Sequence, residues 1–104
     1  MKNAIKTALA LLGALCITTS VFAQEAKLGY VPTEDHPVGK GSVRFAELVA
    51  EKTGGRIKIQ TYGNGVIGNE PQMQSSLQGG FIDVMVGPTS NLVGSIPEFM
   101  IYDL

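Results

Sequence analysis

The sequence predicts an α/β fold, with strands and helices in the order strand, helix, strand, helix, strand. Three observations predict it. Residues 56–62 alternate between apolar and polar side chains, residues 81–86 are almost entirely apolar, and glycine pairs close two helical stretches. Strands that alternate with helices favour a parallel sheet with right-handed crossovers. The alternative is a small antiparallel α+β domain. A first strand lying between the other two, with all three parallel, would decide for the α/β fold.

The first strand is expected at 27–31, where a short apolar run ends at Pro32. The first helix is expected at 38–53, with Pro37 suited to its first turn. Its mostly apolar stripe has the helical spacing i, i+3, i+4 and i+7 and consists of Phe45, Leu48, Val49 and Lys52. Its opposite side carries Arg44, Glu47 and Glu51. The pair Gly54-Gly55 is a strong signal for the end of this helix.

The second strand is expected at 56–62 and the second helix at 70–79. Asn69 is a predicted N-cap, and Gln72 three residues later completes a variant of the capping box. The third strand is expected at 81–86 and, being nearly all apolar, is predicted to be buried on both faces. Asp83 interrupts it, and we interpret this residue as buried and structurally paired rather than catalytic.

An export signal precedes these elements. Lys2 and Lys6 give a positive start, residues 8–17 form an uncharged and mostly apolar run, and the small residue Ala23 suits a cleavage site directly after it. We therefore expect residues 1–23 to be removed and the protein to reach the periplasm. An uncleaved membrane anchor is the alternative, but a spanning helix needs about 20 apolar residues and this run has half that length.

The composition of the mature chain excludes several classes of protein. The one cysteine lies in the signal, so no disulfide can form within residues 24–104. Two of the eight basic residues also lie in the signal, which leaves six against nine acidic residues and a net charge of −3. Without a basic patch, nucleic acid is not an expected partner. Common catalytic motifs are absent, and the glycine pattern of 63–68 is too weak to predict a dinucleotide site, so we expect no cofactor and no metal.

Ligands of open parallel sheets bind outside the carboxyl ends of the strands. The loops at 32–37, 62–69 and 87–91 meet that description. The last offers Thr89, Ser90 and Asn91, of which the first two either contact a ligand or simply make the turn. His36 is a candidate at a helix start, although an N-cap role is favoured. Glu70 either faces the cleft or is a first-turn acid favoured by the helix dipole.

The chain resembles the N-terminal lobe of the solute receptors of tripartite ATP-independent periplasmic (TRAP) transporters, the DctP family. The resemblance extends over residues 27–104. It rests on an ordered set of short motifs: Phe45–Val49, Glu51–Ile57, Tyr62–Gly68, Leu77–Gly80, Asp83, Pro97–Phe99 and Tyr102–Leu104.

This resemblance implies a two-lobe receptor that closes on an organic acid and delivers it to a membrane permease. The acid would be a dicarboxylate, a keto acid or a sugar acid. It also implies first-lobe ligand contacts at Val31, Glu70 and the segment Pro88, Thr89 and Ser90. Residues 24–104 would then be the first lobe of a type II periplasmic-binding-protein-like fold, with the second lobe and its ligand-binding arginine absent. Two alternatives stay open. One is an exported enzyme whose catalytic part is missing, and the other is a lobe that contacts a membrane partner without binding solute.

Overall fold

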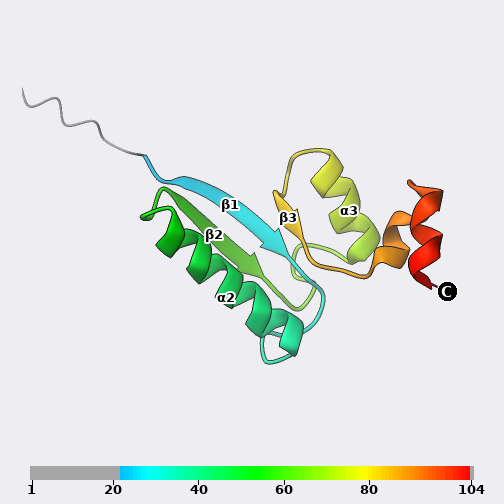
Figure 1. Cartoon of the computed structure of the whole chain (residues 1–104), viewed down its shortest axis with the longest axis horizontal. Helices are drawn as coiled ribbons and strands as arrows, with labels where there is room; N and C mark the ends of the chain where they lie inside the picture. Colours follow the sequence, from blue (N-terminus) through cyan, green and yellow to red (C-terminus); the bar gives the residue numbers. More distant parts are fainter. Residues whose placement is uncertain (1–21, 104) are drawn as a thin grey trace, which may run out of the picture.

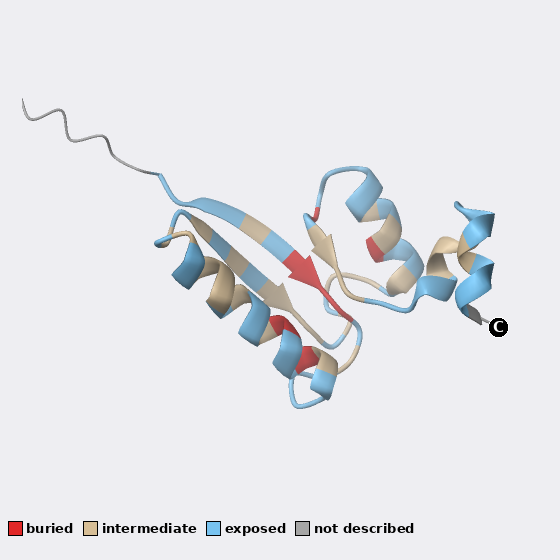
Figure 2. Ribbon diagram, viewed as in Figure 1, coloured by how far each residue is buried: buried red, intermediate tan, exposed pale blue. Residues whose placement is uncertain are grey.

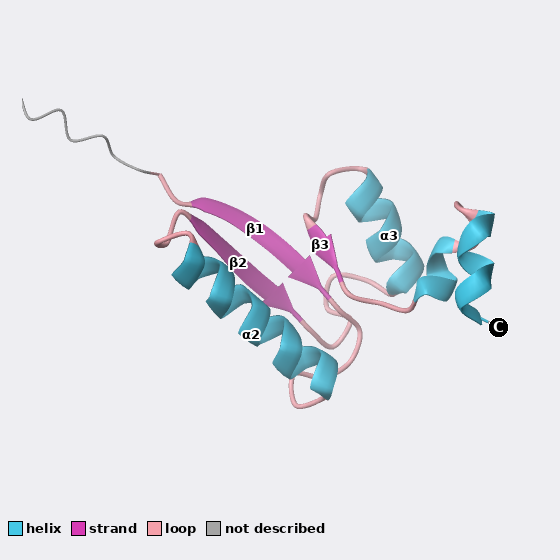
Figure 3. Cartoon of the chain, in the orientation of Figure 1, coloured by secondary structure: helices cyan, strands magenta, loops and turns pink. Residues whose placement is uncertain are grey.

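The computed structural model describes residues 22–103 and has the predicted order of strands and helices, followed by two short 3-10 helices (Figures 1 and 3). Most of the predicted export signal lies outside the described residues. The elements are β1 (Gln24–Gly29), α2 (Pro37–Lys52), β2 (Ile57–Tyr62), α3 (Glu70–Gln78), β3 (Val84–Met85), η1 (Thr89–Leu92) and η2 (Pro97–Asp103).

The sheet confirms the parallel α/β prediction. Its strand order is β2-β1-β3, and β1 is parallel to both neighbours. Gln24 pairs with Ile57 on one side, and Leu28 pairs with Val84 on the other. The antiparallel α+β alternative is therefore wrong for the described residues.

The first strand lies earlier in the sequence than the apolar run at 27–31 predicts. It begins at Gln24, whose backbone N–H donates to the carbonyl of Arg56 at 2.7 Å. The side chains in this first half of β1 are mostly exposed, so the sequence has no apolar pattern there that would predict a strand. Beyond Gly29 the chain leaves the regular ladder, and Tyr30 bonds to Tyr62 and to the loop after it.

The third strand is much shorter than predicted. The expectation of burial on both faces is wrong at Phe81, whose side chain is 77% exposed. Its backbone N–H instead donates to the carbonyl of Ser76, which makes it part of the turn that closes α3. Asp83 is structurally paired as predicted, since its carboxylate accepts from the backbone N–H of Lys27 at 2.8 Å. It is exposed, however, and not buried.

Local signals account for the ends of α2. His36 is its N-cap, with Nδ1 accepting from the backbone N–H of Val38 at 3.2 Å, and Pro37 opens the first turn. At the other end, the hydroxyl of Thr53 donates to the carbonyl of Val49 at 2.7 Å. Gly54 and Gly55 then adopt positive φ angles of 60° and 78°, which glycine tolerates at little cost, and turn the chain into β2.

The predicted capping box of α3 is present. Asn69 accepts from the backbone N–H of Gln72, and the Gln72 side chain accepts from the backbone N–H of Asn69, both at 3.0 Å. The preceding loop contains Asn64 and Gly65, both with positive φ. Caps of this kind hold the first turn of a helix in a defined place. The box therefore fixes the position of Glu70, the first residue of α3.

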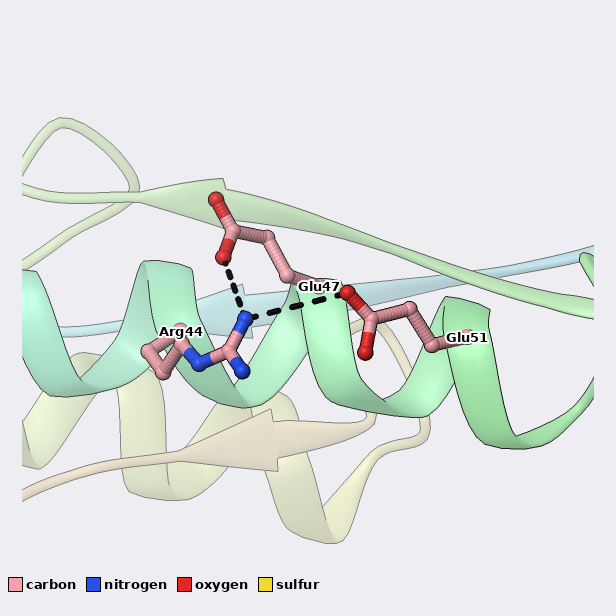
Figure 4. A network of polar contacts seen from close by, with 3 residues as sticks. All are labelled: Arg44, Glu47 and Glu51. Carbon is pink, nitrogen blue, oxygen red and sulfur yellow. Dashed lines mark hydrogen bonds and ion pairs between the residues drawn. The ribbon is translucent and has the colours of Figure 1, made fainter.

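Charged side chains cover the outer face of α2. Arg44 Nη1 lies 3.0 Å from Glu47 Oε2 and 3.8 Å from Glu51 Oε1 (Figure 4). All three side chains are more than half exposed, so these ion pairs contribute little to stability. Their role is to keep this face of the helix in water.

The two helices cover opposite faces of the sheet. Leu28 of β1 lies on the side of α2, whereas a Cβ at the next residue, Gly29, would lie 2.7 Å from Met73 Sδ of α3. Successive residues of a strand point to opposite faces, so this alternation separates the helices. Both crossovers therefore have the arrangement of a doubly wound sheet.

The buried core is small (Figure 2). Among the described residues, the buried apolar side chains are Leu28, Tyr30, Met73 and Ile82. Beside them an apolar groove of about 360 Å³ remains open between α2 and β3. Its lining consists of Leu28, Val38, Gly41, Ser42, Phe45, Val84 and Val86. Phe45 is 45% exposed there, although the helical pattern predicts it in the apolar stripe.

Candidate functional site

The strand order places a candidate binding site between the ends of β1 and β3. The chain leaves β1 for β2 on one side and returns to β3 on the other, so the direction of winding reverses at β1. Loops diverge at such a switch point, and a crevice opens outside the carboxyl ends of the strands. The segments that follow β1 and β3 meet there.

A cavity of about 270 Å³ occupies this position. We call it the carboxyl-end cleft, and its lining consists of Pro32, Val38, Glu70, Val86, Gly87 and Pro88. These residues come from the loop after β1, the first turns of α2 and α3, and the segment after β3. The walls are apolar except at Glu70, the one ionisable side chain among the described residues that line it.

Glu70 is held in a defined position from two directions. The capping box fixes its backbone at the start of α3. Its Oε2 accepts a hydrogen bond of 2.8 Å from Nδ2 of Asn91, which belongs to η1. This bond is partly buried and joins residues 21 positions apart in the sequence. The carboxylate is therefore both a first-turn acid, as the dipole argument predicts, and part of the cleft wall.

The structure brings together two of the six predicted site residues, Glu70 and Pro88, in the lining of the cleft. Val31 directly precedes the lining residue Pro32 and is 37% exposed. Thr89 lines an adjoining hollow of about 170 Å³, which shares Gly87 and Pro88 with the cleft.

The remaining two predicted residues have clear structural roles. His36 caps α2, as the favoured interpretation has it. Ser90 lies in η1, where its carbonyl accepts from the backbone N–H of Val93 at 3.2 Å. No ligand tests the predicted contacts, so all six residues stay predictions.

Sequence reasoning did not identify two features of the cleft. Val38 lines the cleft because the loop after β1 turns sharply into α2. An apolar residue at the start of a helix carries no sequence signal for a place in a binding site. The pairing of Asn91 with Glu70 was also missed, although the sequence places an amide in the right loop. Its partner is distant in sequence, so no spacing rule connects the two.

A mostly apolar cleft with one positioned carboxylate, bonded to an amide, can bind a small ligand. Within residues 22–103 no group of three or more His, Cys, Asp or Glu side chains could hold a metal ion. Among the helices of the same residues, none has the length and apolar character to cross a membrane.

Comparison with known proteins identifies a family. Residues 28–104 match the model of the DctP family, bacterial extracellular solute-binding protein, family 7. A C4-dicarboxylate-binding protein of Bacillus subtilis, DctB, is 36% identical over 78 residues, which cover 75% of this chain and 22% of the relative.

Solved structures show the same similarity. The sugar acid binding protein DctPAm of Advenella mimigardefordensis, in complex with galactonate, superposes with a TM-score of 0.75 at 35% identity. The superposition covers 79% of this chain and 26% of the galactonate-binding protein. A TRAP periplasmic solute-binding protein of Sulfitobacter sp. NAS-14.1, with bound β-D-galacturonate, superposes with a TM-score of 0.73 at 31% identity. This match covers 78% of this chain and 27% of the Sulfitobacter protein.

The chain thus spans about a quarter of the length of each of these relatives. The family match covers residues 28–104, far more than half of the chain. The chain belongs to the DctP family of bacterial extracellular solute-binding proteins.

Proposed function

We propose that this chain is the first lobe of an exported two-lobe receptor that binds a small organic acid in the carboxyl-end cleft. The observation that carries the proposal is the position of the cleft. It lies at the switch point of the sheet, where open α/β sheets bind their ligands. The named relatives that bind C4-dicarboxylates, galactonate and galacturonate support an organic acid as the ligand.

In this proposal the second lobe closes over the cleft and supplies an arginine for the ligand carboxylate. A bidentate arginine–carboxylate pair is strong and geometrically specific. Val31, Glu70, Pro88, Thr89 and Ser90 would contact the ligand from the first lobe, and His36 would border the site. The receptor would then hand the acid to the membrane permease subunits of a TRAP transporter, without chemical change to the ligand.

The experiment that tests this function uses the full reading frame that contains the chain. Calorimetric titration of its purified product with succinate, malate, pyruvate, galactonate and glucuronate should show one acid binding with a Kd on the order of micromolar or tighter. The ligand should be recovered unchanged after incubation. A product that binds none of these acids, or that converts one of them, would contradict the proposal.

Export to the periplasm is the second part of the proposal. Cleavage after Ala23 would leave β1 complete, because the first hydrogen bond of that strand is made by Gln24. We expect mass spectrometry of the periplasmic product to give Gln24 as its first residue. A product that retains Met1 in the membrane fraction would show instead that the signal is an uncleaved anchor.

A further inference from the structure

Two side-chain hydrogen bonds hold the segment after β3 against α3. One is the bond of 2.8 Å between Asn91 Nδ2 and Glu70 Oε2, and the other is a bond of 3.2 Å between Gln74 Nε2 and Ser95 Oγ. Each joins residues 21 positions apart, and the two bonds lie one helical turn apart along α3. They differ in one respect: only the first reaches the carboxyl-end cleft.

The bond to Asn91 leaves Glu70 with unused capacity to accept hydrogen bonds. A carboxylate has two oxygens with about four acceptor positions. Among residues 22–103, Asn91 is the one side chain that donates to it, through Oε2. The ion pairs of the described residues involve Arg44 with Glu47 and Glu51 and leave the charge of Glu70 unpaired. Within the described part of the chain, Glu70 thus has no cationic partner, and its Oε1 accepts no hydrogen bond.

The carboxylate of Glu70 favours a ligand hydroxyl beside it and disfavours a ligand carboxylate there. A ligand hydroxyl can donate to the free Oε1, and hydrogen bonds to charged groups are stronger than neutral ones. A second ligand carboxylate at the same place would bring two like charges together in a partly buried site, which is costly. Beside a Glu70 without a cationic partner, we expect the end of the ligand to carry hydrogen-bond donors and no negative charge.

We propose that Glu70, held in position by Asn91, selects polyhydroxylated monocarboxylic acids, such as aldonic and uronic acids, against dicarboxylic acids. This inference rests on the proposed function and narrows its substrate class. Asn91 is a positioning residue: it fixes Oε2 so that Oε1 lies toward the ligand. The ligand carboxylate then binds at the other end of the site, away from this lobe's one acidic wall residue.

The test compares Kd values for galactonate, glucuronate, succinate and malate in the product of the full reading frame. The unchanged protein should bind one sugar acid at least about tenfold tighter than either dicarboxylate. Glu70→Gln keeps the size of the side chain and an oxygen for Asn91 but removes the charge. It should lower that preference about tenfold, chiefly by improving the binding of dicarboxylates.

Asn91→Ala should weaken sugar-acid binding about tenfold and leave dicarboxylate binding as poor as before, because the charge remains. Ser95→Ala is the matched control. It removes the neighbouring tether outside the cleft and should change neither affinity. The melting temperature of each variant separates a loss of binding from a loss of folding, and Glu70→Gln tests the charge even if Asn91→Ala does not fold.

Three outcomes would overturn the inference. If the protein binds a dicarboxylate more tightly than every sugar acid, the proposed function stands and the substrate class is wrong. If Asn91→Ala and Ser95→Ala change binding equally, Asn91 is a tether and does not position Glu70. If no acid of the panel binds, the proposed function fails and this inference fails with it.

Discussion

Residues 24–104 purified alone are expected to bind succinate, malate, pyruvate and sugar acids no more tightly than about millimolar, whereas the product of the full reading frame should reach about micromolar. Small-molecule sites bury most of their ligand, and the carboxyl-end cleft covers one side only. The lobe also lacks the proposed arginine. Losing one charge-assisted pair of about 1.5–3 kcal/mol weakens binding roughly ten- to a hundredfold before the lost enclosure is counted.

The comparison needs proof that the isolated lobe is folded. The apolar groove beside α2 is open, and Met100, Ile101 and Tyr102 of η2 are exposed, so the lobe is expected to be of low stability and prone to associate. Dispersed amide signals in a nuclear magnetic resonance spectrum would show a folded lobe. Micromolar binding by that folded lobe would mean that the site is complete without a second lobe.

Gly39→Ala is expected to destabilise the fold by about 1–3 kcal/mol, because the new methyl group would meet backbone atoms that have little freedom to move. An ideal Cβ at Gly39 would lie 2.5 Å from the carbonyl oxygens of both Thr33 and Glu34. The loop after β1 would have to shift, and with it Pro32, which lines the cleft. The same variant should therefore weaken ligand binding as well as stability.

Gly41→Ala provides the matched control, two residues further along α2. A Cβ at Gly41 meets no atom within 4 Å, so alanine should stabilise the helix by roughly 0.5–1 kcal/mol through its higher propensity. Urea unfolding of the two variants should thus show changes of opposite sign. If Gly39→Ala stabilised the fold as well, helix propensity, and not the close approach of the loop, would decide the effect at Gly39.

Local signals made the helices predictable. Pro37, the Asn69 cap and the glycine pairs act through neighbouring backbone groups, so the predicted helices at 38–53 and 70–79 differ from α2 and α3 by one residue at most. The strands were less predictable, because an apolar run reports burial and not pairing. The polar start of β1 is paired but exposed, whereas Phe81 is apolar but lies in a turn.

The candidate site was predictable where it follows from topology. Once the sheet is parallel, the loops after its strands must converge, and this reasoning places the loop at 87–91, which includes Pro88, at the cleft. For Glu70 the same reasoning left two roles open, and the family resemblance pointed to the cleft. The bond between Glu70 and Asn91 depends on how α3 and η1 pack, which the sequence does not state.

The strand order also has a consequence for when the fold can form. The central strand β1 precedes both of its partners in the sequence. Gln24 pairs with Ile57, 33 residues later, and Leu28 pairs with Val84, 56 residues later. Every sheet contact is therefore long-range, and such contacts form slowly because large loops must close first. A nascent chain shorter than about 85 residues cannot complete the sheet. Folding of this sheet is therefore expected to begin only after most of the 104 residues have been synthesised.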